Sequence, residues 1–116
     1  MRESTLQLIN YVMILLLLVT LALHLAMQAF VGVSGYEDAL RYDTALARYR
    51  EPFSVSLLTI LLVAAVYHGL FGLRNILLEM RSSPRWNRTV TFGVLGLGVV
   101  MLVWGLRTIV VAFSGA

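Results

Sequence analysis

Long stretches of this sequence carry no charged side chain. No charged residue lies between Glu3 and Glu37, and two further charge-free runs extend over residues 52–73 and 89–106. A helix needs about 20 apolar residues to cross the hydrocarbon core of a bilayer, because each residue adds only about 1.5 Å. All three runs approach or exceed that length. The sequence therefore predicts an all-α membrane protein with three transmembrane helices.

The composition points to the same class. Apolar residues make up 59% of the 116 residues and charged residues 13%, which is about half the share in a typical soluble domain. A chain this short cannot hide so much apolar surface in one core, which disfavours a soluble enzyme. The arginines behind the formal net charge of +3 are scattered along the sequence, which disfavours nucleic-acid binding. The absence of cysteine excludes disulfides and iron–sulfur ligation within this chain.

The predicted transmembrane helices belong to a single domain of residues 1–116 and extend over Leu6–Val33, Pro52–Met80 and Asn87–Phe113. A proline at the start of the second run suits the first turn of a helix. The linker of residues 34–51 combines four acids, three arginines and several tyrosines, which predicts a short helix on the membrane surface. A cleaved signal peptide is the alternative interpretation of the first run, although that run is far longer than the apolar region of a signal.

The connection between the second and third helices, residues 81–88, contains three arginines and no acid. By the positive-inside rule, this connection and the amino terminus lie in the cytoplasm. The margin is small, since the first linker also carries three arginines and Arg107 lies near the opposite face. The prediction is a multi-pass protein of the inner (cytoplasmic) membrane.

Polar groups inside a span are costly, so each is a candidate functional residue. At about 100° per residue, a stripe roughly 60° wide on the second helix contains His68, Gly72, Asn75 and Glu79. A neutral imidazole can bind haem iron through one nitrogen while a hydrogen bond holds the other, and Gly72 leaves room for a flat macrocycle. The alternative, equally open, is that His68 only forms a hydrogen bond to a neighbouring helix. Arg74 lies about 120° from the stripe and is expected to extend towards the headgroups.

His24 shares a stripe of the first helix with Thr20 and Gln28. An interhelical hydrogen-bond cluster is the favoured interpretation, and a metal ligand is the alternative. From the helical rise, His24 lies close to the outer face of the membrane and His68 nearer its middle. The two histidines are therefore not expected to share one iron, and each would need a partner histidine on another subunit. In the third helix, Gly98 and Gly105 lie two turns apart on one face, which predicts a close helix–helix contact.

The string His68-Gly-Leu-Phe-Gly72-Leu-Arg74-Asn75-Ile-Leu-Leu-Glu79 resembles the second helix of the membrane anchor subunits of succinate dehydrogenase. In that family a haem-ligating histidine is followed by glycine four residues later and by an acid eleven residues later. The chain length, the three spans and the aromatic linker are most similar to the smaller of the family's two hydrophobic anchors, a small cytochrome b anchor. Met80 stands where this small anchor often has a tyrosine that forms a hydrogen bond to the quinone.

The resemblance implies a subunit that catalyses nothing alone. It would pack with a second membrane anchor subunit into a haem-binding bundle and hold an iron–sulfur subunit and a flavoprotein subunit at the bilayer. Electrons from succinate would then reach a quinone at the cytoplasmic face. In this scheme His68 is an axial ligand of haem b, Gly72 packs against the haem, and Arg74 is a candidate contact for a haem propionate.

The resemblance also makes Glu79 a candidate quinone residue, with an ion pair to Arg81 as the alternative. Dihaem relatives make His24 a candidate ligand of a second haem. Two other functions remain open: the anchor of a quinol:fumarate reductase, and a three-span structural or assembly protein without a cofactor. A small transporter is disfavoured, because no span is broken around a central charged cavity.

Overall fold

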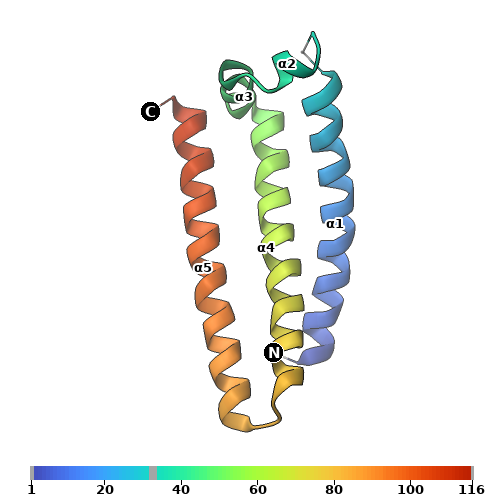
Figure 1. Cartoon of the computed structure of the whole chain (residues 1–116), viewed down its shortest axis with the longest axis vertical. Coiled ribbons are helices and arrows are strands. Elements are labelled where there is room, and N and C mark those ends of the chain that lie inside the picture. The colour runs from blue at the N-terminus through green and yellow to red at the C-terminus, as the bar shows by residue number, and fades with distance from the viewer. Residues whose placement is uncertain (1, 32–33, 116) are drawn as a thin grey trace.

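The computed structural model describes residues 2–31 and 34–115. Within these ranges the helices are α1 (Glu3–Phe30), α2 (Tyr36–Ala39), α3 (Tyr42–Tyr49), α4 (Pro52–Met80) and α5 (Pro84–Ser114) (Figure 1). Helices α1, α4 and α5 are long and apolar enough to span a membrane. Within these ranges, the prediction of an all-α chain with three helices long and apolar enough to span a membrane is confirmed.

The helix bounds differ from the predicted ones mainly at the amino-terminal ends. Helix α4 covers the predicted range with its proline in the first turn. Helix α5 starts at Pro84, before the predicted Asn87, because Ser83 Oγ accepts a hydrogen bond from Trp86 N (3.2 Å) and caps the helix.

Helix α1 starts at Glu3, earlier than the predicted Leu6, and ends at Phe30. The predicted end at Val33 lies outside the described residues. Instead of the single predicted surface helix, the linker forms two short helices, α2 and α3, at one end of the long helices (Figure 1). Helix α2 is followed by Leu40, and Arg41 in extended conformation then interrupts the helical backbone before α3 begins.

The three long helices form a flat row in which α4 lies between α1 and α5 (Figure 1). Helix α4 packs against both neighbours, and no contact between α1 and α5 is found within the described ranges. The arrangement measures 55 × 28 × 22 Å. Few apolar side chains are buried, and most large ones on α1 and α5 are exposed. Such a surface suits a bilayer, where lipid tails cover apolar side chains as well as protein does.

Glycines set the close contact between α4 and α5. A Cβ added at Gly105 would lie 2.7 Å from Leu62 Cδ2, and one added at Gly98 would lie 3.0 Å from Leu70 Cδ1. The predicted helix–helix contact at these two glycines is confirmed. By contrast, a Cβ at Gly96 would meet no atom within 4 Å.

Replacing Gly105 by alanine is therefore expected to destabilise the protein by about 1–2 kcal/mol. The added methyl group overpacks the contact with Leu62, and the higher helix propensity of alanine offsets only part of that cost. The matched control is Gly96→Ala, which adds the same methyl group into open space and should be neutral or slightly stabilising. Thermal unfolding in detergent measures both variants. Equal stability of the two would contradict a tight α4–α5 contact.

Asp38 organises the linker through both carboxylate oxygens. Oδ2 accepts a hydrogen bond from Ser34 N (3.0 Å), and Oδ1 accepts one from Thr44 Oγ1 (3.2 Å). The hydrogen bond from the Ser34 backbone is the largest cause that holds the pKa of Asp38 below its usual value of 3.8. Thr44 and the nearby charges of Arg41 and Arg48 lower the pKa further.

This shift predicts how the order of the linker depends on pH. Because the pKa of Asp38 is lower in the folded chain than in the unfolded chain, its ionised form stabilises the folded linker above about pH 4. That contribution is lost as the pH falls through the folded pKa. Amide hydrogen exchange of residues 34–44, corrected for intrinsic rates, should accelerate in this acid range. In Asp38→Asn exchange should be fast throughout, and a persisting acid transition in that variant would assign the effect to another group.

Candidate functional site

His68 lies near the middle of α4, half-buried beside α1. Its Nδ1 is 3.1 Å from Oδ1 of Asn10, a side chain on α1 that is only 7% exposed. An amide oxygen can only accept a hydrogen bond, so Nδ1 carries the proton and donates it. The other ring nitrogen, Nε2, then keeps its lone pair. No hydrogen bond to Nε2 is found within residues 2–31 and 34–115.

Open space adjoins the two glycines that follow His68 along α4. A Cβ added at Gly69 or at Gly72 would meet no atom within 4 Å. Gly72 lies one helical turn beyond His68 on the same face of α4, so this face carries bare backbone one turn from the imidazole. These residues fit a haem, with Nε2 as the iron ligand and the backbone at Gly72 as a flat contact surface.

Tyr67 adds a second hydrogen bond between α4 and α1 close to His68. Tyr67 Oη donates a hydrogen bond to the carbonyl oxygen of Leu6 on α1 (2.9 Å). Its ring stacks on Phe71, with 6.0 Å between centroids and 8° between planes. Together with the bond between Asn10 and His68, these contacts hold the imidazole in one position relative to α1.

Arg74 joins all three long helices, and its expected extension towards the headgroups stays a prediction. Its Nη1 and Nη2 donate hydrogen bonds to the two carboxylate oxygens of Glu3 on α1, at 3.1 and 2.7 Å. Its Nε donates to Thr91 Oγ1 on α5 (3.2 Å). Arg74 is only 9% exposed. The carboxylate of Glu3 on α1 compensates the buried charge of Arg74, a contact that a helical wheel of α4 alone does not show. A contact between Arg74 and a haem propionate remains a prediction.

Glu79 is exposed near the carboxyl end of α4. An ion pair between Glu79 and Arg81, the alternative considered from the sequence, is not found in the part of the chain that the structure describes. The Arg81 guanidinium instead lies 5.8 Å from the ring centroid of Trp86, whose Nε1 donates a hydrogen bond to Leu77 O (2.8 Å). The Glu79 carboxylate is thus accessible for contact with a ligand at this end of α4.

His24 lies far from His68, near the linker. It is 14 residues beyond Asn10 on α1, about 21 Å by the helical rise, in agreement with the prediction that the two histidines do not share an iron. The predicted interhelical hydrogen-bond cluster is not found among the described residues. Thr20 Oγ1 donates to Leu16 O (2.6 Å) of its own helix instead, since a hydroxyl in a helix can bond to a carbonyl one turn back.

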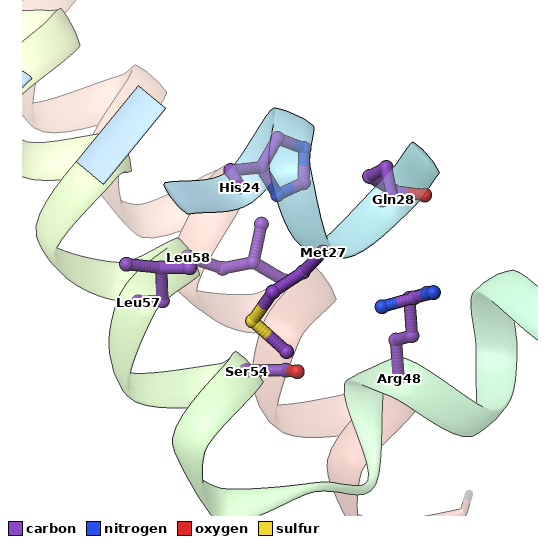
Figure 2. A pocket seen from close by; sticks show the side chains of 7 residues that line it. All are labelled: His24, Met27, Gln28, Arg48, Ser54, Leu57 and Leu58. Carbon is purple, nitrogen blue, oxygen red and sulfur yellow. The ribbon is translucent and has the colours of Figure 1, made fainter. Parts of the chain in front are cut away.

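A small cavity adjoins His24 at the junction of α1, α3 and α4. Figure 2 shows its lining side chains: His24, Met27, Gln28, Arg48, Ser54, Leu57 and Leu58. Its volume of about 20 Å³ suits roughly one water molecule. A haem ligated by His24 would have to lie outside this cavity, and the second haem remains a prediction.

Arg48 was not singled out in the sequence, although it is only 8% exposed. Its Nη2 donates a hydrogen bond to the carbonyl oxygen of Val31, which ties α3 to the end of α1. Its buried Nε has no hydrogen-bond partner within the described ranges. Figure 2 shows the guanidinium near Gln28, beside the cavity. A water molecule there would satisfy the Nε donor.

These residues determine which metal chemistry the chain can support. No group of three or more metal-binding side chains is found among the residues that the structure describes. An iron at His68 would therefore take its remaining ligands from a porphyrin and from another subunit. Comparisons of the chain with protein-family models, curated proteins and solved structures found no match.

Proposed function

We propose that this chain is the small membrane anchor subunit of a succinate dehydrogenase and supplies His68 as one axial ligand of haem b. The hydrogen bond from His68 Nδ1 to Asn10 Oδ1 carries the proposal. It holds the imidazole in the tautomer that a haem ligand needs, in the middle of a membrane span. The open backbone at Gly72 supports the proposal further, because a porphyrin needs a flat surface free of side chains.

Haem b, when bound, supplies one-electron transfer inside the bilayer. The chain's own residues orient the imidazole ring. Asn10 holds His68 in place, and Tyr67, stacked on Phe71 of the same helix, ties α4 to Leu6 of α1. The second axial ligand would come from a second anchor subunit. The only other histidine of this chain is His24, which lies about 21 Å along α1 from Asn10, the partner of His68.

The soluble partners and the quinone would lie at the end of the long helices where α4 connects to α5. Five arginines and two carboxylates lie towards this end, whereas four of each lie towards the linker end. By the positive-inside rule this asymmetry supports a cytoplasmic location of the connection and the amino terminus, in a cell with an inner membrane. Glu79, exposed at that end, would hold or release a proton near a quinone headgroup. The anchor of a quinol:fumarate reductase would use the same arrangement in the opposite direction.

The test is the visible spectrum of the complex purified through this chain. After dithionite reduction, a sharp b-type α band and a pyridine haemochrome are expected, with a flavoprotein and an iron–sulfur subunit in the same preparation. A complex of those subunits without haem would refute the ligand role and leave the anchor role in place. A haem protein without those subunits would refute the anchor role.

A structural or assembly protein without a cofactor is the second candidate. The bond between His68 and Asn10 favours it too, because it satisfies polar groups of two neighbouring helices inside the bilayer. The two candidate functions differ at Nε2 of His68, which would bind haem iron in the anchor subunit and would bind no metal in the structural protein. A purified chain that has neither haem nor the soluble subunits would support this second function.

A further inference from the structure

The fold gathers arginines that are scattered in the sequence. One end of the three long helices, the end with the α4–α5 connection, carries five arginines: Arg2, Arg74, Arg81, Arg85 and Arg88. This basic end contains only two carboxylates, Glu3 and Glu79. The opposite end contains four arginines and four carboxylates. The whole formal net charge of +3 therefore lies at the basic end.

Most of this positive charge is free to meet a ligand. Glu3 is paired with Arg74 and does not neutralise the other arginines. The remaining arginines of the basic end are exposed, and no ion pair to any of them is found in the described ranges. No acid follows Glu79 in the sequence, so the entire α4–α5 connection and the start of α5 are uncompensated.

A hollow of about 380 Å³ lies within this positive surface, between the end of α4 and the start of α5. It is lined by Leu78, Arg81, Ser82, Ser83, Pro84 and Asn87. Arg81, the two serines and Asn87 offer hydrogen-bond donors that suit phosphate oxygens. Leu78 and Pro84 add apolar side chains to the lining. The hollow thus combines polar, positively charged and apolar side chains where two helices long enough to span a membrane are joined.

We propose that this hollow binds the phosphate group of an anionic phospholipid. A lipid fits better than a free phosphate ion because the apolar wall at Leu78 would contact the glycerol and the first part of an acyl chain. Arg81 pairs with the phosphate from the rim, and Arg85 and Arg88 raise the local concentration of anionic headgroups. Lipid binding here depends on the charges and the hollow alone, and holds whether or not His68 binds haem.

The two tryptophans allow a test on the full chain in a bilayer. Trp86 lies beside Arg81 at the basic end, whereas Trp104, 70% exposed, lies 18 residues further along α5, about 27 Å away. Single-tryptophan variants, Trp104→Phe and Trp86→Phe, are reconstituted in phosphatidylcholine that contains brominated phosphatidylglycerol or brominated phosphatidylcholine. Brominated phosphatidylglycerol is expected to quench Trp86 several-fold more effectively than brominated phosphatidylcholine. Trp104 should be quenched equally by both lipids.

Arg81→Gln in the Trp104→Phe background should lower the preference for the anionic lipid at Trp86 by about fivefold. Arg107→Gln, which removes the same charge at the other end of α5, should leave that preference unchanged. Inorganic phosphate at constant ionic strength should not compete. Equal quenching of Trp86 by the two lipids, an Arg81→Gln variant with full preference, or displacement by inorganic phosphate would each overturn the proposal.

Discussion

Replacing His68 by alanine is expected to abolish the b-type α band of the purified complex. The imidazole supplies one of the two axial ligands of the proposed haem, and alanine has no donor atom. The measurement is the reduced-minus-oxidised spectrum at equal protein concentration, with subunit content checked on the same sample. An unchanged band in a correctly assembled His68→Ala complex would contradict the ligand assignment.

Asn10 provides a variant that keeps the ligand itself. Asn10→Ala removes the acceptor for His68 Nδ1, and the loss of such a supporting hydrogen bond typically lowers metal affinity by about 10–100-fold. The variant should retain the α band but lose haem on dilution or at raised temperature. This result separates ligation from a folding defect, since alanine at position 10 leaves His68 in place. Haem retention equal to that of the unmodified complex would argue that the bond between Asn10 and His68 serves packing alone.

His24→Ala distinguishes one haem from two. With a single haem on His68, the variant should keep the full haem content by pyridine haemochrome. With a second haem on His24, it should lose one of two. We expect the first result, because no hydrogen bond that would orient the His24 imidazole is found among the described residues, whereas Asn10 orients His68. A loss of all haem in His24→Ala would contradict both assignments.

The spans could be predicted because they depend on a local property of the sequence. The length of a run without charged residues can be read directly from the sequence and compared with the thickness of a bilayer. Helix α4 covers the predicted range. The early start of α5 depends on one side-chain cap at Ser83, and the break in the linker depends on the extended backbone at Arg41. Such details arise from single residues and are weakly encoded in hydropathy.

The candidate site could be predicted only in part, because its partners come from another helix. The stripe of His68, Gly72 and Glu79 is a property of α4 alone. Asn10 and Glu3 become relevant only when α1 packs antiparallel to α4, and the sequence does not show which face of α1 meets α4. Antiparallel packing places residues early in α1 beside residues late in α4. A search of α1 for polar partners at that depth would have pointed to Asn10 and Glu3.

The two members of the ion pair between Glu3 and Arg74 differ in their exposure to solvent, so their removal should have different effects on stability. Arg74, on the middle helix α4, is 9% exposed, whereas the Glu3 side chain is 67% exposed. Glu3→Gln leaves a buried guanidinium without its counter-charge. We expect a loss of about 2–3 kcal/mol, somewhat below the cost for a fully buried pair because water reaches Glu3. Thermal unfolding in detergent, followed by circular dichroism, measures this loss.

The opposite substitution should be far milder. Arg74→Met replaces the buried cation with an apolar side chain of similar length and leaves an accessible carboxylate that water can solvate. The change in stability should therefore be small, because apolar replacements of buried ion pairs are often neutral or stabilising. The double variant Glu3→Gln/Arg74→Met should recover most of the stability lost in Glu3→Gln, because no buried charge remains unpaired.

Glu79→Gln is the matched control, since it removes a carboxylate of the same end that forms no ion pair in the described ranges. Its effect on stability should stay within about 0.5 kcal/mol. If Glu3→Gln were as mild as Glu79→Gln, or if the double variant recovered nothing, Arg74 would not depend on Glu3 for its charge balance. The guanidinium would then have to find its counter-charge outside this chain. A haem propionate is the anion that the proposed bundle offers, so the same stability series also tests whether Arg74 contacts the cofactor or only ties α1, α4 and α5 together.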